Sequence, residues 1–211
     1  MATETVSVLT GDIVKSTALH AAQRDAVMAA LEDTAGIIAG WPTAVRYERF
    51  RGDGWQLWLA EPKWTLRAAL FARAGVRAAC DRGDTRIAAG LGAAELGATL
   101  AASTGAAFER SGRGLERLKP HQLWYIDGKI GSTAEQALLR GLFGLCDERS
   151  RHWTARQADI FRRLGGPKAP LMAEVAEKLG VQPQTVQTHF TRAGGHALLE
   201  ATAAFEEAMT S

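Results

Sequence analysis

The spacing of apolar residues predicts alternating strands and helices over the first part of the chain. Residues 6–10 form a short apolar run, residues 47–59 alternate between two faces around a glycine-containing turn, and residues 86–91 form a further apolar strand. Residues 18–39 and 64–80 carry apolar side chains at helical spacing. The expected order is βαββαβ, the ferredoxin-like pattern of an α+β fold, in which the first and third strands are central neighbours.

The second predicted helix contains three arginines, Arg67, Arg73 and Arg77, opposite its apolar side. Arginine usually buries only its aliphatic stem and keeps the guanidinium in water. These residues are therefore predicted to form a solvated face.

The middle of the chain adds two helical patterns and one strand. Residues 103–118 predict a helix, residues 121–126 a fifth strand, and residues 133–146 an amphipathic helix suited to connection or dimerisation. Residues 147–152 are charged or polar throughout, so the domain boundary is placed there. The first domain is expected to span residues 1–148.

The remaining residues, 149–211, are expected to form a small all-α domain. Helical patterns occur at 154–164, 171–179, 183–193 and 197–209. Gly180 and Val181 form the turn between the second and third of these helices, as in a DNA-binding helix-turn-helix. The inward positions before this turn are expected to be Ala173, Val175, Ala176 and Leu179.

The outward face of the helix after the turn carries the expected DNA contacts. Polar side chains of the kind that reach base edges are Gln184, Thr185, Gln187, Thr188 and His189. Arg192 and Lys178 are available for phosphates of duplex DNA. The alternative is a helical module that serves only oligomerisation.

Composition narrows the class of protein without indicating an activity. The 211 residues are 46% apolar and 23% charged, with a formal net charge of +2, so any nucleic-acid surface must come from local clustering. No apolar run approaches the ~18 residues of a membrane span, and no signal peptide is recognisable at the N-terminus. Cys80 and Cys146 have no metal-spaced partner and are predicted to be buried thiols of a cytoplasmic protein.

Two carboxylates stand where predicted strands end. Asp53 lies between Gly52 and Gly54 at the tip of the hairpin, and Asp12 directly follows the first strand. If the strands are neighbours, the two acids lie side by side as oxygen ligands for Mg²⁺ or Mn²⁺. Asp53 taken alone is also explained by turn chemistry, because Asp-Gly is the commonest short hairpin signal.

A phosphate site is predicted beside the first acid. Lys15, Ser16 and Thr17 open the helical segment that follows Asp12. Free backbone N–H groups at such a start suit a phosphate.

Three segments in this order resemble the catalytic domain of class III nucleotidyl cyclases. They are residues 12–17 (DIVKST), 51–54 (RGDG) and 86–92 (RIAAGLG). The chain is similar in particular to the small SatD family, which joins such a domain to a C-terminal helix-turn-helix. The resemblance implies that Asp12, Ile13 and Asp53 hold Mg²⁺ or Mn²⁺, two ions if the protein is active, on a nucleoside triphosphate or related nucleotide.

The resemblance also assigns a helix that completes the cyclase site across a two-fold interface, which implies a homodimer. Counting from Gly105, Arg113 fills the arginine position, but Glu109 stands where the cyclases have asparagine. A carboxylate cannot donate the hydrogen bond of an amide and repels a triphosphate. The structural alternative is a surface pair between Arg113 and Glu109.

Arg49 departs from the family in a second way. It occupies the position where adenylate-selective cyclases have lysine and guanylate-selective ones glutamate. Its planar fork reads a base edge differently from lysine, so the base stays open.

Two main hypotheses of function follow. The first is a nucleotide-sensing regulatory protein that controls DNA binding; the second is an active metal-dependent nucleotidyl cyclase or nucleotidyltransferase whose helical module targets or dimerises it. Glu109 favours the first, because loss of the amide argues against ordinary cyclisation and leaves nucleotide binding possible. A third class is a domain that has lost its ligand and serves only for assembly.

Overall fold

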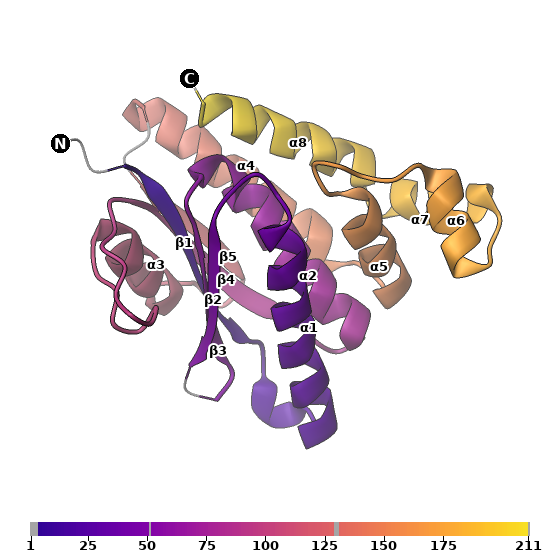
Figure 1. Cartoon of the computed structure of the whole chain (residues 1–211), viewed down its shortest axis with the longest axis horizontal. Coiled ribbons are helices and arrows are strands. Elements are labelled where there is room, and N and C mark those ends of the chain that lie inside the picture. The colour runs from indigo at the N-terminus through magenta and orange to yellow at the C-terminus, as the bar shows by residue number, and fades with distance from the viewer. Residues whose placement is uncertain (1–3, 51, 129–130, 211) are drawn as a thin grey trace.

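The computed structural model describes residues 4–50, 52–128 and 131–210, and these form a mixed α+β structure around one five-stranded sheet (Figure 1). The strands are β1 (Val6–Ile13), β2 (Val45–Phe50), β3 (Gly54–Leu59), β4 (Thr85–Gly92) and β5 (Trp124–Gly128). Their order across the sheet is β2-β3-β1-β4-β5. The β4–β5 pair is parallel and the other three pairs are antiparallel.

Eight α-helices and two short 3₁₀ helices accompany the sheet in the described ranges. The α-helices are α1 (Ala21–Ala39), α2 (Thr65–Ala79), α3 (Ala106–Glu116), α4 (Thr133–Arg151), α5 (Ala155–Leu164), α6 (Met172–Leu179), α7 (Pro183–Arg192) and α8 (Gly195–Ala208). The 3₁₀ helices are η1 (Ser16–Ala18) and η2 (Pro62–Trp64). None of the helices in these ranges is long and apolar enough to cross a membrane.

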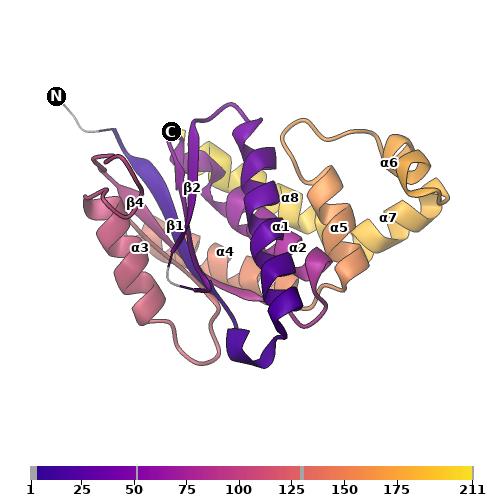
Figure 2. The same ribbon diagram turned by 60° about the horizontal axis from the view of Figure 1, so that its bottom comes forward.

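The sheet is covered on both faces, with α3 on one side and α1 and α2 on the other (Figure 2). Strand β1 shows why: Leu9 and Ile13 join the core beneath α1 and α2, whereas Val8 packs with Ala107 of α3. A central strand covered on both faces buries consecutive apolar residues. This explains why the neighbours Val8 and Leu9 are both fully buried although they point to opposite faces of the sheet.

The C-terminal helices share one hydrophobic core with the rest of the chain. Phe161 of α5 lies 6.2 Å from Phe71 of α2 and 6.3 Å from Phe190 of α7, measured between ring centroids. The same cluster of buried residues runs from β1 to Phe205 of α8. The division at residue 148 stays a prediction; in the structure this position lies inside α4, and apolar packing joins the parts on either side of it.

The prediction that the arginines of α2 form a solvated face is wrong. Arg73 has no exposed surface and Arg67 is 7% exposed, while Arg77 is partly buried. Arg67 pairs with Glu206 of α8 at 2.6 Å. The helical pattern was read correctly, but α4, α5 and α8 cover the side of α2 that was expected to face water.

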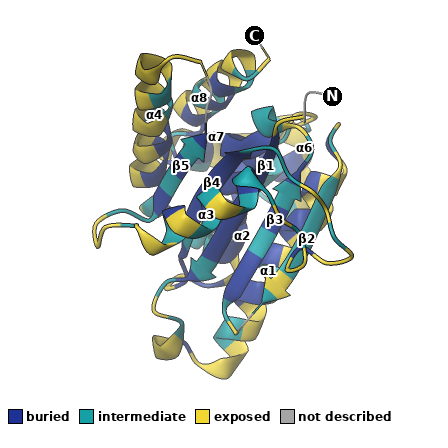
Figure 3. Ribbon diagram, turned by 90° about the vertical axis from the view of Figure 1, so that its left-hand side faces the viewer, coloured by how far each residue is buried: buried dark blue, intermediate teal, exposed yellow. Residues whose placement is uncertain are grey.

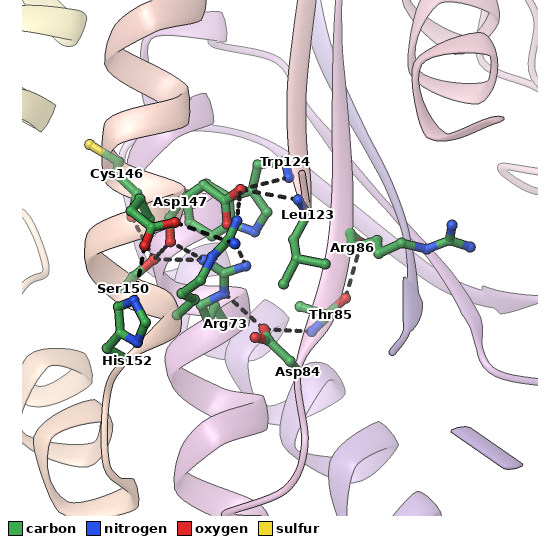
Figure 4. A network of polar contacts seen from close by, with 12 residues as sticks. Arg73, Asp84, Thr85, Arg86, Leu123, Trp124, Cys146, Asp147, Ser150 and His152 are labelled. Carbon is green, nitrogen blue, oxygen red and sulfur yellow. Dashed lines mark hydrogen bonds and ion pairs between the residues drawn. The ribbon is translucent and has the colours of Figure 1, made fainter. Parts of the chain in front are cut away.

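Arg73 lies at the centre of a buried polar network that joins α2, β4, β5 and α4 (Figure 4). Its guanidinium pairs with Asp84 at 2.9 Å and with Asp147 at 2.8 Å, and it donates to Ser150 Oγ at 2.8 Å. It also lies 4.3 Å from the ring centroid of Trp124. The charged stretch at residues 147–152 forms the end of α4, and its Asp147 and Ser150 are buried partners of Arg73 on α2.

Two further boundaries differ from the sequence prediction. The fifth strand is Trp124–Gly128 instead of residues 121–126, and α4 continues to Arg151. Ala173 of α6 is exposed, although it was expected to face inward. Both cysteines are free and buried, as predicted.

Candidate functional site

The β2–β3 hairpin presents Asp53 at its tip, as the sequence pattern predicts. Phe50 and Gly54 are the last paired residues of the two arms, and Gly52 has a left-handed φ of 79°. A Cβ on Gly54 would lie 2.7 Å from the Phe50 carbonyl oxygen, so a glycine is needed for the tight return. Arg51 lies outside the described residues.

Strand β1 brings Asp12 next to this hairpin. Asp12 is opposite Gly54 on β3 and opposite Arg86 on β4. Arg86 Nε donates to Asp12 Oδ1 at 2.7 Å, and its Nη2 pairs with the other carboxylate oxygen. Asp12 and Asp53 therefore lie at the same end of the sheet, as expected. The Asp12 carboxylate is already paired with a cation of the chain itself, Arg86.

Both acids affect the pKa of the Arg86 guanidinium. The hydrogen bond that Arg86 donates to Asp12 is the main cause that raises the pKa of Arg86, burial opposes it, and the charges of Asp12 and Asp53 add to the rise. The guanidinium therefore stays protonated and lies within electrostatic range of both candidate ligands.

The backbone at Asp12 is held by neighbouring side chains. Thr85 Oγ1 donates to the Asp12 carbonyl at 2.9 Å, and the indole N–H of Trp55 donates to Thr85 Oγ1 at 3.0 Å. A Cβ on Gly11 would meet the Trp55 ring and the Arg86 carbonyl oxygen at 2.5 Å, so only glycine fits there. These contacts fix the backbone at Asp12, and strand alternation puts its side chain on the same face as Val8, the α3 side of the sheet.

A pocket of about 670 Å³ lies on the other side, between the hairpin, η1 and the start of α1. Its lining comprises Ile13, Ser16, Thr17, Arg24, Asp25, Met28, Arg49, Gly52 and Asp53. Five of the residues predicted from sequence, Ile13, Ser16, Thr17, Arg49 and Asp53, are thus brought together. The volume is in the range of small-molecule sites.

Lys15 stands apart from this lining and has φ 50°, the one left-handed value at a non-glycine residue in the described part of the chain. Such backbone conformations cost energy and cluster at functional sites. The turn between β1 and η1 therefore holds Lys15 in an unfavourable backbone conformation, as is common at functional sites.

Arg24 and Asp25 are lining residues that the sequence analysis missed. Arg24 Nη1 donates to the Leu19 carbonyl at 2.6 Å, which folds its side chain back over η1. The signal was available in principle, because α1 begins at Ala21 and one turn of helix places these charges beside its N-terminal end.

The acids fit a divalent cation only in part. Among the described residues, no group of three or more His, Cys, Asp or Glu side chains is arranged to hold a metal ion. Mg²⁺ often uses only one or two carboxylates together with substrate phosphates, and in such a site Asp12, Asp53 and the Ile13 carbonyl would be the donors. Arg86 must release Asp12 before that carboxylate can serve.

Glu109 and Arg113 are not brought to the two acids within one chain. They lie on the outer face of α3, with side chains 67% and 56% exposed, and are 3.6 Å apart as an i, i+4 pair. The inward face of the same helix is formed by Ala107, Ser111 and Gly114. The described contacts of Glu109 and Arg113 are those of a surface pair.

The helices α6 and α7 are joined by a short turn at the edge of the molecule (Figure 1). Gly180 ends α6 with φ 63°, and Val181 N donates to the Ala176 carbonyl at 3.0 Å. Val186 and Phe190 of α7 are buried. The predicted outward residues Gln184, Thr185, Gln187, Thr188 and Arg192 are exposed, and His189 is partly exposed.

Comparisons with known proteins found no match to any family model, any curated protein or any solved structure.

Proposed function

We propose that this chain is a nucleotide-binding regulatory protein that binds duplex DNA, built on a ferredoxin-like, class III cyclase-like unit of the SatD type. In this proposal α6 and α7 form a helix-turn-helix, and the pocket between the hairpin and η1 takes a nucleoside triphosphate or related nucleotide.

The observation that carries the proposal is the exposed polar face of α7. Its apolar residues Val186 and Phe190 are fixed in the core, so the orientation of the outward side is set by packing. Gln184 and Gln187 are among the side chains that then stand free, and amide side chains read base edges in the major groove. A rigid helix with an uncovered amide and hydroxyl face suits DNA better than apolar oligomerisation.

The nucleotide part of the proposal is supported by the charges around the pocket. Arg49 and Arg24 can meet phosphate or base oxygens, and Ser16 and Thr17 offer hydroxyl and backbone donors. Asp53 at the rim and Asp12 on β1 would share Mg²⁺ or Mn²⁺, and a bound cation would neutralise phosphate charge. Arg86 would have to leave Asp12 for this, so a metal ion competes with the guanidinium in the proposal.

Communication between the two sites is supported by shared packing. Arg149 Nη2 donates to the Arg192 carbonyl at the end of α7 at 2.8 Å, and the Trp153 indole donates to the Ala193 carbonyl at 2.8 Å. Arg149 belongs to α4, whose Asp147 holds Arg73 of α2. A ligand that shifts the sheet end therefore has packed elements through which to alter α7.

The alternative is an active metal-dependent nucleotidyl cyclase or nucleotidyltransferase. The observation that favours it is the convergence of Asp53, Arg49 and the η1 turn on one pocket. Glu109 and Arg113 count against it, because they form a surface pair and reach the acids only if a second copy supplies them.

One experiment separates these functions. The full chain is titrated with duplex DNA selected from random sequences, with and without Mn²⁺ and each nucleoside triphosphate, and the same mixtures are analysed for cyclic or linked products. The regulator predicts an enriched sequence and a nucleotide-dependent shift of DNA affinity without turnover; reciprocity requires the same factor in nucleotide affinity when DNA is added. Product formation without sequence-selective binding would favour the enzyme. If neither DNA binding nor product formation is seen, the remaining hypothesis is a domain that serves only for assembly.

Asp53→Asn is the matched test of the pocket. This change removes the charge and keeps the size of the side chain, so nucleotide-dependent thermal stabilisation in the presence of metal should be lost. Asp127→Asn, on β5 at the other edge of the sheet, should leave that stabilisation unchanged. Wild-type protein that no triphosphate stabilises would contradict the nucleotide proposal.

A further inference from the structure

The pocket between the hairpin and α1 has an apolar floor beneath a polar rim. Met28 of α1 and Ile13 of β1 are 2% and 4% exposed and supply the floor. Buried and exposed residues alternate at helical spacing along α1, so one side of this helix packs inward and the other is open (Figure 3). An apolar floor with a few polar groups around it is the usual composition of a site for a flat organic ring.

Two oppositely charged side chains of this pocket have no partner in the part of the chain that the structure describes. Asp25 and Arg49 are exposed, and neither makes a hydrogen bond or an ion pair there. The second arginine, Arg24, already donates its Nη1 to the Leu19 carbonyl at 2.6 Å. Besides Asp53 at the hairpin tip, the pocket therefore offers a ligand one carboxylate from α1 and one guanidinium from β2.

The carboxylate of Asp25 indicates which part of a nucleotide lies beside it. A phosphate would be repelled by this charge, whereas Ser16 and Thr17 of η1 offer the hydroxyl and N–H donors that a phosphate needs. Asp25 can only accept hydrogen bonds and Arg49 can only donate them. The matching group is uncharged and carries donors and acceptors in one plane, which describes a base.

Guanine is the purine whose hydrogen-bonding groups match both side chains. Its O6 and N7 are neighbouring acceptors that the fork of an arginine meets with two hydrogen bonds, and its N2 amino group and N1–H donate to a carboxylate. Adenine instead places an amino donor beside N7, which opposes a guanidinium, and its N1 is an acceptor that a carboxylate cannot satisfy.

We infer that this pocket selects guanine nucleotides, with Arg49 donating to O6 and N7 of the base and Asp25 accepting from its N1–H and N2 amino group. The ring lies over the apolar floor of Met28 and Ile13. The inference rests on the proposed nucleotide-binding function and adds the base, which that function leaves open. It also gives a role to Asp25, which belongs to neither the metal site nor the DNA surface.

Titration of the full chain with each nucleoside triphosphate in the presence of Mn²⁺ tests the choice of base. GTP should bind at least about tenfold more tightly than ATP, as expected for one bidentate contact to a base. If ATP, CTP or UTP binds as tightly as GTP, the inference is wrong and nucleotide binding itself stands. If no triphosphate binds, the proposed nucleotide function is wrong as well.

Altered nucleotides assign the two contacts one at a time. Inosine triphosphate lacks the N2 amino group and should bind wild type about tenfold more weakly than GTP, and Asp25→Ala should abolish this difference. 7-Deaza-GTP lacks the N7 acceptor, and its weaker binding should likewise disappear in Arg49→Ala. GTP without its 2′ and 3′ hydroxyls should bind as tightly as GTP. A loss with this nucleotide and none with inosine triphosphate would place Asp25 at the ribose and overturn the inference.

A change of selectivity provides the last arm. A glutamine side chain pairs with N6 and N7 of adenine, so Arg49→Gln should raise the affinity for ATP relative to GTP. Arg156→Gln makes the same change at an exposed arginine of α5 outside this pocket and should leave the ratio of the two affinities unchanged. Melting temperatures without nucleotide should be equal for wild type and all variants. A ratio that neither Arg49→Gln nor Asp25→Ala alters would contradict the assigned contacts.

Discussion

Arg86 binds both carboxylate oxygens of Asp12 across the β1–β4 pair. A bidentate arginine supplies positive charge at the position where a divalent cation would be expected. The end of the sheet is therefore neutralised from within the chain, and a metal ion has to compete with a guanidinium for the same oxygens.

Removing this competitor should strengthen metal binding in the absence of nucleotide. Arg86→Ala frees Asp12, and because the arginine side chain is 42% exposed, the pair is worth only about 0–1 kcal/mol. The Mn²⁺ dissociation constant should fall by up to about fivefold, measured by titration calorimetry. Arg86→Ala combined with Asp12→Asn should reverse the gain, and an Asp12→Asn variant that binds Mn²⁺ as tightly as wild type would show that Asp12 is no ligand.

The network around Arg73 predicts a large and local loss of stability. Arg73→Met removes the fully buried arginine that pairs with both Asp84 and Asp147 and leaves them only the partly exposed Arg77 and Arg151, which should lower the free energy of unfolding by about 3–5 kcal/mol. Arg113→Met makes the same chemical change at an exposed surface pair and should cost no more than about 0.5 kcal/mol. Urea unfolding of both variants measures the difference; similar losses would show that burial of the network is not what matters.

Cys146 predicts how stability changes at high pH. Burial raises the pKa of its thiol from 9.0 to about 12 in the folded protein. The unfolded chain releases this proton first, so the contribution is fully present below pH 9.0 and is lost as the pH rises towards 12. Cys146→Ser should flatten the alkaline loss of stability in urea titrations. The wild-type thiol should also react with a disulfide reagent only on unfolding, and rapid labelling of native protein would contradict its burial.

The face of α7 predicts two distinguishable effects on DNA binding. Gln187→Ala removes a side chain suited to base edges and should reduce sequence preference by about 1–3 kcal/mol at one position. Arg192→Ala removes a phosphate contact and should weaken all sequences alike, with the salt dependence reduced by about one unit of slope. Salt series of DNA titrations measure both. Thr191, exposed on the same helix outside the predicted set, offers Thr191→Ala as a control.

Most elements of this fold could be predicted because their signals are local. The period-two pattern around Gly52 and Gly54 predicted the hairpin, and Gly180 with Val181 predicted the turn between α6 and α7. Thr154, the first residue of the helical pattern at 154–164, caps α5 and accepts a hydrogen bond from Gln157 N at 3.3 Å. These residues act through backbone conformation and neighbours within one turn, which a sequence reveals directly.

The candidate site could be predicted only in part. The sequence placed Asp12 and Asp53 at adjacent strand ends, but it did not reveal that Arg86 already holds Asp12. It also offered two accounts of Arg113, and the pair with Glu109 is the one present within a single chain. Which of the charges at a strand end meet depends on register across the sheet, and register is set by long-range pairing.

The sequence by itself determined the order of strands and helices, the hairpin that carries Asp53 and the polar outward face of α7. Only the tertiary structure decided that Arg73 is buried against Asp147, 74 residues further along the chain, and that the C-terminal helices share a core with the sheet. A helical repeat shows which side chains lie on one face but not what that face meets. Burial of a charge depends on partners distant in sequence, and here those partners are Asp147 on α4 and Asp84, the residue just before β4.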